Sequence, residues 1–437
     1  MSSSSGAVLY TEVLDRSTWG RGHWRLFSVI SLNYFLDGVL FSIAPLVAFI
    51  LIPDLYYIAF ALNLLAETAG ALLLGHLADR YGRRAMFTLA IALEVASLLL
   101  LFPLYSLPVA LVALTSVLTF GIGGEFGAAY AAMAELSPVR HRGKALLLAT
   151  NFWNVGAALI AGLALIYSAL YTDVGAQLRS LFLTVILAAA LIRLTRLGLP
   201  ESPRWLALRG KGERAREVVR TFAGYEGEVE VMPSQASGVS LGAALARYRL
   251  RLAILAVVTV VQYVTYNMMA YYAPYAPGFA FGPEAAPYVI FVANLGAALG
   301  AIPLALLIDR ARRASNLYAF LGGFLGSLAL LLSHSQASAP AFYASLFLAL
   351  VFSEWAWGAL SVLQSELFPT GVRASVVGLL TSLTGIAGAA VVGVEFYLDA
   401  PLFLALASAL WALGLLASLA WYVKGEESAK RPLEELA

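Results

Sequence analysis

The sequence predicts an all-α membrane protein in which twelve transmembrane helices form two pseudo-symmetric six-helix bundles. Three observations indicate this fold class: an apolar composition, a series of long apolar segments, and charged motifs that recur between the two halves. Of the 437 residues, 61% are hydrophobic and only 12% are charged. A soluble domain carries about 25% charged residues, so this chain has more apolar surface than water can solvate and requires lipid around it.

The apolar segments are long enough to cross a bilayer, since a spanning helix needs about 20 mostly apolar residues. The longest polar stretch, residues 201–247, separates six such segments from six others. We therefore expect a first bundle over 25–200, a cytoplasmic linker over 201–247, a second bundle over 248–422, and tails at 1–24 and 423–437. The predicted segments lie at about residues 25–51, 55–77, 85–105, 108–133, 145–170, 179–199, 250–274, 285–308, 315–333, 341–364, 373–395 and 400–422.

The linker is expected to contain one structured part. Residues 204–222 alternate charged and apolar side chains, which favours an amphipathic helix on the cytoplasmic surface. Residues 224–240 are expected to be a flexible linker.

Positive charge lies on one side of the predicted membrane. The loops that follow even-numbered segments carry most of the arginines, among them Arg83, Arg142, Arg313 and Arg373, whereas Arg179 falls on the other side. Loops rich in Lys and Arg remain in the cytoplasm. Both tails are therefore predicted to be cytoplasmic, in a protein of the cell (plasma) membrane.

Composition excludes several function classes. The chain has no cysteine, which excludes disulfides, thiolate metal sites and cysteine nucleophiles. Its four histidines are scattered, and no Gly-x-x-x-x-Gly-Lys-Ser/Thr loop for an ATP-driven pump occurs. A net charge of +2 gives no indication of nucleic-acid binding. We therefore expect no enzyme activity, no cofactor and no bound metal.

Charged motifs occur once in each half of the chain. The pair Asp79-Arg80 recurs 230 residues later as Asp309-Arg310. A Glu…Pro…Arg spacing at 135–142 recurs 231 residues later at 366–373. Since two separate motifs keep this register, the halves are predicted to be related bundles around a central site, an architecture that transporters share.

Residues 75–84 read Gly-His-Leu-Ala-Asp-Arg-Tyr-Gly-Arg-Arg. Gly82 permits a tight turn, and Asp79 can lie at a helix N-terminus, where an anion is stabilised by about 0.3–2 kcal/mol. The arginines can pair with acids on neighbouring helices. In every fixed position this segment resembles the signature loop of the major facilitator superfamily, which implies a two-bundle transporter fold.

Residues 199–206, Leu-Pro-Glu-Ser-Pro-Arg-Trp-Leu, resemble a motif of sugar porters and their relatives, which include organic-cation, phosphate and aromatic-acid carriers. The resemblance implies a cytoplasmic ion-pair network that latches the bundles when the central site faces outward. The alternative is solvated surface charge, where each pair is worth about 0–1 kcal/mol. The residues assigned to this gate are Asp79, Arg80, Arg83, Arg84, Glu135, Arg142, Glu201, Arg204, Asp309, Arg310, Glu366 and Arg373.

Residues 262–274, Gln-Tyr-Val-Thr-Tyr-Asn-Met-Met-Ala-Tyr-Tyr-Ala-Pro, are similar to a seventh-helix run of sugar porters. In that family the Gln and Asn hydrogen-bond sugar hydroxyls and the tyrosines form an outer gate. The chain departs from the family pattern at Val261, Thr265 and Thr150. Interhelical hydrogen bonding is the alternative role of Gln262 and Asn267. The substrate-binding candidates are Gln262, Tyr266, Asn267, Tyr271, Tyr272, Glu354 and Trp357.

Five carboxylates fall near the middle of predicted segments. A charge at that depth costs at least ~2.5 kcal/mol, so such an acid is functional by default. Glu94 is the expected exception because the third helix is often peripheral, and Glu67 is expected to be satisfied by Asn63 one turn earlier. The five are Asp37, Glu67, Glu94, Glu125 and Glu354.

Asp37 and Glu125 are the predicted proton-coupling residues. Residues 33–38 resemble the first-helix Asp motif of proton-coupled porters, and residues 121–127 resemble the fourth-helix Gly-Gly-acid motif of proton symporters. The arginine that usually pairs with the first-helix Asp is replaced by Thr115, so burial disfavours the charged form of Asp37.

Glu354 lies beside Trp355 and Trp357 on the tenth predicted helix and has no counterpart in these families. An acid beside aromatic rings can bind a cation through charge and ring face. The alternative is a protonated residue that holds helices together.

The resemblance covers essentially the whole chain and implies secondary active transport by alternating access. We expect a monomer in the lipid bilayer that imports a small polar solute by proton-coupled symport. A sugar or polyol is the favoured substrate. The absence of Lys and Arg at mid-membrane depth weakens an organic-acid or phosphate carrier. The surplus of buried acids favours an organic cation as the alternative substrate. The alternative of another class is a membrane sensor that does not transport.

Overall fold

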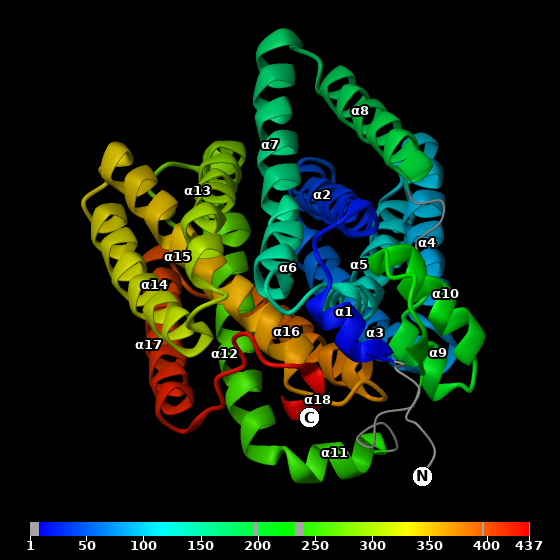
Figure 1. The fold of residues 1–437 in the computed structure, drawn as a ribbon. Coiled ribbons are helices and arrows are strands. Elements are labelled where there is room, and N and C mark those ends of the chain that lie inside the picture. Colours follow the sequence, from blue (N-terminus) through cyan, green and yellow to red (C-terminus); the bar gives the residue numbers. More distant parts are fainter. Residues whose placement is uncertain (1–7, 196–199, 232–238, 396, 437) are drawn as a thin grey trace, which may run out of the picture.

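The computed structural model describes residues 8–195, 200–231, 239–395 and 397–436. Within these residues, twelve helices are long and apolar enough to cross a membrane. They stand side by side in two groups (Figure 1). This confirms the predicted fold class, including its two pseudo-symmetric bundles.

The first bundle contains α2 (Arg21–Leu51), α3 (Tyr56–Tyr81), α4 (Arg83–Leu104), α5 (Pro108–Leu136), α6 (Arg142–Thr150) with α7 (Phe152–Leu170), and α8 (Val174–Thr195). The second contains α12 (Arg249–Asn267), α13 (Ala286–Leu307), α14 (Arg312–Ser335), α15 (Ala339–Glu366), α16 (Arg373–Glu395) and α17 (Ala400–Lys424). Short η4 (Pro283–Ala285) precedes α13.

The α12 helix changes its winding at its far end. It continues as the π-helix η2 (Met268–Tyr272) and the 3₁₀-helix η3 (Ala273–Tyr275). Pro274 has no backbone N–H to donate to the preceding turn, which disfavours regular α-helix there. A π-turn inserts an extra residue into the turn and often occurs at functional sites.

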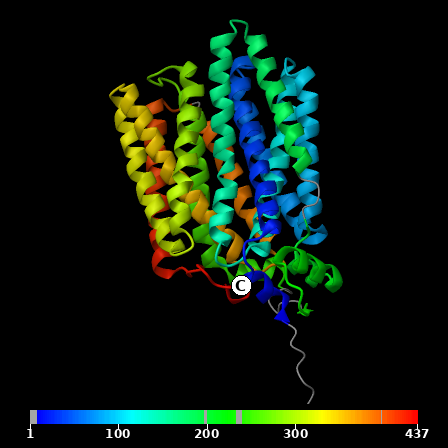
Figure 2. The same cartoon turned by 45° about the horizontal axis from the view of Figure 1, so that its top comes forward.

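In the described chain, seven short elements outside the spanning helices lie together at one end of the bundles, which we name the terminal face (Figure 2). It is built from β1 (Val8–Leu9), α1 (Tyr10–Arg16), α9 (Pro203–Leu208), α10 (Gly212–Ala223), β2 (Val229–Glu230), α11 (Leu241–Arg247) and α18 (Leu433–Leu436).

The prediction of a single amphipathic helix over 204–222 was wrong, because the structure has two helices there. The chain forms α9 and α10 with a break between them, where Gly210 has a φ of +70°, a conformation that favours glycine. The apolar face of α10 packs on protein rather than lipid, since Val219 lies in one cluster with Tyr10 and Leu14.

The expected flexible linker over 224–240 is partly structured. Val229 and Glu230 pair in parallel with Val8 and Leu9. Residues 232–238 lie outside the described part of the chain.

The bundles approach each other most closely where α3 crosses α16. A Cβ added at Gly378 would lie 2.2 Å from the backbone oxygen of Ala71 and 3.5 Å from the Cα of Gly75. Small residues therefore bring the two backbones into contact, a packing mode common in membrane helices. A second crossing joins α7 to α13, where the Asn151 side chain donates to the Ala298 carbonyl at 2.9 Å.

Gly378→Ala should separate the bundles at the terminal face. The added methyl group would meet backbone that has no side-chain rotamer to change, and such overpacking costs about 1–3 kcal/mol. Spin labels at exposed Thr88→Cys and Lys424→Cys, in an otherwise cysteine-free chain, would report a longer mean distance. Gly393→Ala is the matched control, because nothing lies within 4 Å of its Cβ position. Identical distance distributions in the two variants would contradict the expectation.

Candidate functional site

A cavity of about 40 Å³ lies between the two bundles, midway along the helices. Its wall combines aromatic rings with a few polar groups, the composition typical of small-molecule sites. No Lys, Arg or His is among its lining residues in the described chain. These are Tyr34, Phe41, Phe126, Thr150, Trp153, Asn154, Gln262, Tyr263, Tyr266, Asn267, Glu354 and Trp357.

Two predicted amides of α12 lie in this wall. Gln262 donates from Nε2 to the Ser353 carbonyl at 3.2 Å, and Asn267 donates from Nδ2 to the Tyr263 carbonyl at 2.9 Å. The remaining amide oxygens of Gln262 and Asn267 are buried without a hydrogen-bond partner among the described residues. Two acceptors are therefore left available for a bound molecule.

Tyr271 and Tyr272 were predicted as substrate-binding residues, but the structure places them outside the cavity wall. The Tyr271 hydroxyl is 2.9 Å from that of Ser42 in the first bundle, and Tyr272 stacks on Phe60 with ring centroids 5.7 Å apart. Tyr271 follows Gln262 by nine residues, or about two and a half turns of a regular helix, so the two side chains point to opposite sides of it.

Further rings join the bundles at the same level. Tyr275 lies 4.5 Å from Phe49, centroid to centroid. We name Phe49, Phe60, Tyr271, Tyr272 and Tyr275 the aromatic cover. It closes the helices at the end opposite the terminal face.

Glu354 reaches the cavity from α15. Its Oε2 accepts a hydrogen bond from Asn154 Nδ2 at 2.7 Å, while Oε1 is buried without a hydrogen-bond partner in the described chain. Of its two neighbouring tryptophans only Trp357 lines the cavity, because the indole of Trp355 donates to the Gly300 carbonyl at 2.6 Å.

Tyr266 connects the two sides of the cavity. Its hydroxyl lies 2.6 Å from Asn294 Oδ1 and 3.2 Å from Asn154 Oδ1. Asn154 was missed at the sequence level, although two asparagines (Asn151 and Asn154) within an apolar segment were a usable signal. The break between α6 and α7 falls at Asn151 and turns both amides toward the second bundle.

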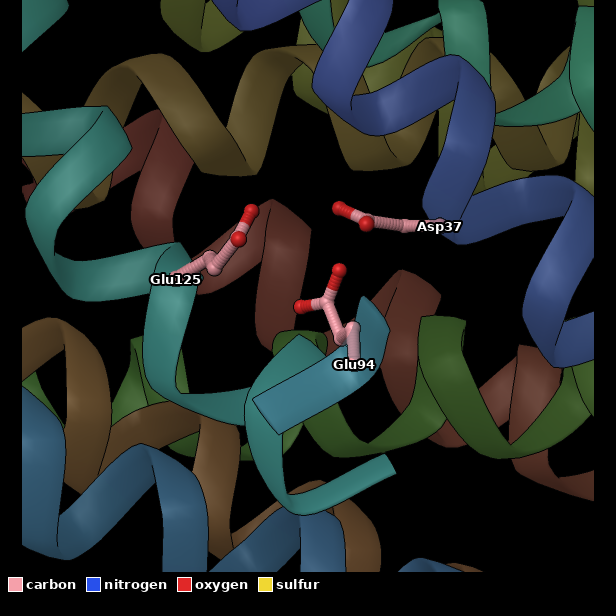
Figure 3. Close-up of side chains that lie close together, drawn as sticks. All are labelled: Asp37, Glu94 and Glu125. Carbon is pink, nitrogen blue, oxygen red and sulfur yellow. The ribbon is translucent and has the colours of Figure 1, made fainter. Parts of the chain in front are cut away.

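Three carboxylates gather in the first bundle, behind the cavity wall. Oxygens of Asp37, Glu94 and Glu125 all lie within 4.8 Å of one another (Figure 3). They come from three different helices, α2, α4 and α5. Asn33 donates to Asp37 Oδ2 at 2.9 Å from one turn earlier.

The expectation that Glu94 is peripheral was wrong. Its side chain is fully buried and points toward Asp37 and Glu125 (Figure 3). Gly121 on α5 makes room for it, since a Cβ there would lie 2.8 Å from the Glu94 Cγ.

The carboxylate cluster is separated from the cavity by one aromatic layer. Tyr34 lines the cavity and is within electrostatic reach of both Asp37 and Glu125. Its ring packs 5.9 Å from that of Phe126, the residue after Glu125.

The expectation that Asn63 satisfies Glu67 was wrong. The Asn63 amide oxygen accepts from Thr115 at 3.1 Å and from Ser116 at 3.0 Å instead. Glu67 Oε2 accepts from the Tyr263 hydroxyl at 2.6 Å. This bond links an acid of the first bundle to a cavity residue of the second.

The predicted charged residues meet at the terminal face around Glu135. Its Oε1 lies 3.3 Å from the guanidinium of Arg83 in the same bundle and 2.7 Å from that of Arg373 in the other. All three side chains are at most 1% exposed. The alternative of solvated surface charge is therefore wrong for these residues.

Two aspartates of the repeated motif cap helices of the opposite bundle. Asp79 accepts from the backbone N–H and hydroxyl of Ser375 at the start of α16, each at 2.8 Å. Asp309 accepts from the Lys144 N–H at the start of α6 at 3.2 Å. The sequence repeat is thus a reciprocal exchange of helix caps between bundles.

The rest of the network surrounds this centre. Glu201 accepts from the first backbone N–H groups of α4, at Arg83 (2.9 Å) and Arg84 (3.2 Å). Glu366 pairs with Arg312 at 3.0 Å. The side chains of Arg80, Arg84 and Arg310 are exposed.

Asp15 and Glu434 were missed because they lie in the tails, far in sequence from the motifs. Asp15 Oδ1 pairs with Arg142 at 2.7 Å and Arg204 at 3.1 Å. Glu434 pairs with Arg204 at 3.0 Å. Burial alone would raise the pKa of Glu434, but the Arg204 guanidinium outweighs it and holds that pKa below its usual range.

Comparison with known proteins agrees with this architecture. Residues 54–437 match the family described as "Sugar (and other) transporter". The solved structure of the proton:xylose symporter XylE bound to 6-bromo-6-deoxy-D-glucose, a protein from E. coli, superposes with a TM-score of 0.77 over 98% of each chain at 19% identity.

Curated relatives are similar over part or most of their length. The inner membrane metabolite transport protein YgcS of Escherichia coli is 30% identical over 48% of each chain, so the matched region spans about half of that relative. The putative niacin/nicotinamide transporter NiaP of Bacillus subtilis is 28% identical over 83% of this chain and 86% of its own. With its match over residues 54–437, this chain belongs to the sugar (and other) transporter family, a family of transporters rather than enzymes, and its twelve candidate spans indicate a multi-pass membrane protein.

Proposed function

We propose that this protein is a secondary active transporter that moves a small polar solute by alternating access, in symport with protons. The observation that carries the proposal is the cavity between the bundles, lined by aromatic rings and by amides with unsatisfied oxygens. A polar cavity at the interface of two repeats is the arrangement expected of such carriers.

A solute rich in hydroxyl groups fits the amides of this wall. Buried amide oxygens without partners carry a desolvation cost that a donor from the solute would relieve. The structural neighbour XylE is a xylose symporter by name, which supports a sugar or polyol as the first candidate substrate. A wall without Lys, Arg or His opposes an organic acid or phosphate as substrate.

The cluster of Asp37, Glu94 and Glu125 is proposed to carry the coupling proton. Three carboxylates this close repel one another, which disfavours the fully ionised cluster. Such groups titrate as a unit rather than as separate residues. Tyr34 lies between the cluster and the cavity, so a bound solute is one side chain away from the acids.

The ion pairs around Glu135 are proposed to be the inner gate, and the aromatic cover the outer one. The contacts of both sets are formed in this structure, which supports a proposed state with both gates closed. The concentration of arginines on the terminal face indicates that this face is cytoplasmic. We propose a monomer in the cell membrane with both tails on the cytoplasmic side.

Transport itself is tested in proteoliposomes with a panel of radiolabelled solutes, with and without an imposed proton gradient. Accumulation of one solute that depends on the gradient is the expected result. Solute binding without any flux would instead favour a membrane sensor.

Gln262→Ala and Asn267→Ala should each raise the apparent KM for the solute about tenfold or abolish uptake, because each removes a hydrogen bond worth about 1 kcal/mol or more. Each variant also loses the amide N–H bond to the Ser353 or Tyr263 carbonyl, so thermal unfolding in detergent should show a loss of stability of only about 0.5–1.5 kcal/mol. Normal uptake kinetics in both variants would exclude the amides from the binding site.

Asp37→Asn should abolish accumulation driven by the proton gradient while preserving solute exchange at equilibrium. A neutral amide can hydrogen-bond as the acid does but cannot release a proton. Glu125→Gln should behave alike if the cluster acts as one unit. Gradient-driven accumulation in both variants would rule the cluster out as the coupling site.

Asp79→Asn should shift the protein toward forms open at the terminal face. The change removes the charge that pairs with Arg83 at 3.1 Å and that caps α16, an interaction worth about 0.3–2 kcal/mol. Labelling of Thr150→Cys in the cavity wall with an impermeant maleimide from that face should become several-fold faster. Asp173→Asn, an exposed acid of the opposite face, is the control. Equal labelling rates would leave the motif without a gating role.

A further inference from the structure

We propose that Glu354 and the rings around the cavity form a subsite for a protonated amino group, so that the solute is an amino sugar or amino alcohol. This inference rests on the proposed transport function and narrows its substrate class. The geometry of one carboxylate carries it, together with the type of polar atom that the cavity leaves unsatisfied.

Glu354 is a carboxylate in a wall without a cation. Its side chain is 3% exposed, and no Lys, Arg or His lines the cavity in the described chain. One oxygen is held by Asn154, and the other has no hydrogen-bond partner among the described residues. A buried acid with half its acceptor capacity unused is costly unless a donor meets it.

The position of Glu354 is fixed by the protein. Asn154, which donates to its Oε2, also donates to Asn151 Oδ1 at 3.0 Å. The Asn154 amide oxygen is within 3.2 Å of the Tyr266 hydroxyl. Asn154 therefore has partners on both of its polar atoms, and it holds the carboxylate against the cavity in a set orientation.

The unsatisfied side-chain atoms of the wall have a common character. Glu354, Gln262 and Asn267 each leave one oxygen without a partner, and each of these oxygens can only accept when the acid is ionised. The Tyr34 hydroxyl, also in the wall, interacts with the hydroxyl of Tyr130. These three oxygens therefore favour a solute that donates hydrogen bonds to them.

An ammonium group meets this requirement better than a hydroxyl. It offers three donors and no acceptor, and its bond to a carboxylate is charge-assisted. Aromatic rings in the same wall, among them Trp153, Tyr266 and Trp357, can attract a cation that lies over their faces. The hydroxyl groups of the same solute can then donate to Gln262 and Asn267.

The test compares two matched pairs of ligands on the purified full chain: D-glucosamine with D-glucose, and ethanolamine with ethylene glycol. Binding is measured by quenching of tryptophan fluorescence. In at least one pair the amine should bind about tenfold or more tightly than its neutral partner. Equal affinity within both pairs would overturn the proposal.

In Glu354→Gln the amine and its neutral partner should bind with about equal affinity, and the affinity for the neutral ligand should stay unchanged. Glu395→Gln is the matched control, because Glu395 is a buried acid of the same bundle outside the cavity wall, and it should keep the preference. A preference that persists in Glu354→Gln would show that another group binds the amine and would overturn the assignment. If Glu354→Gln does not fold, Glu354→Asp replaces it, and an unchanged preference in that shortened acid would count against the subsite.

Uptake separates this inference from the function on which it rests. Gradient-driven uptake of neutral polyols without uptake of amines would refute the amine subsite and leave proton-coupled transport in place. If neither class crosses the proteoliposome membrane, the transport proposal itself fails.

Discussion

The structure depends on the burial of charge between the two bundles. Glu135 is fully buried and is shared by an arginine of its own bundle, Arg83, and one of the other, Arg373. Removing one member of a buried ion pair costs about 3–5 kcal/mol, because the remaining charge loses both its partner and water. The cavity lies above this point, and its dimensions follow from how closely the ion pairs and the α3–α16 crossing bring the bundles together.

The acids at mid-membrane depth differ in where they point, and this separates their proposed roles. Asp37, Glu94 and Glu125 face one another inside a single bundle, so the proton exchange proposed for them would need no contact with the solute. Glu67 is bonded to Tyr263 across the bundle interface, and Glu354 faces the cavity wall. Carboxyl groups would thus serve three proposed purposes in one protein: proton coupling, a hydrogen bond between the bundles, and ligand binding.

The fold and the motif residues could be predicted from the sequence because both depend on short-range patterns. Apolar length identifies the helices, and the repeated Asp-Arg and Glu…Pro…Arg spacings identify the charged network. Glu94 and Glu67 were misassigned because their partners come from other helices, and the spacing along one chain does not show which acids meet. Tyr271 and Tyr272 were included as substrate-binding residues on the resemblance to sugar porters, and a sequence motif does not show that their side chains contact Ser42 and Phe60 of the other bundle. Asp15 and Glu434 carry no motif, and only the folded tails bring them to Arg204.

The aromatic cover and the ion pairs around Glu135 are held by different kinds of interaction, so they should respond differently to temperature. When the rings of the aromatic cover separate, apolar surface becomes exposed to water and the heat capacity of the system rises. When the ion pairs around Glu135 separate, mainly charged and polar groups become exposed, and the heat capacity falls. Hydrophobic association weakens on cooling. Cold should therefore favour the form open at the end opposite the terminal face, and warmth the form open at the terminal face. Label distances recorded at each end over a range of temperatures would reveal this, and equal populations at all temperatures would show that the two closures are energetically alike.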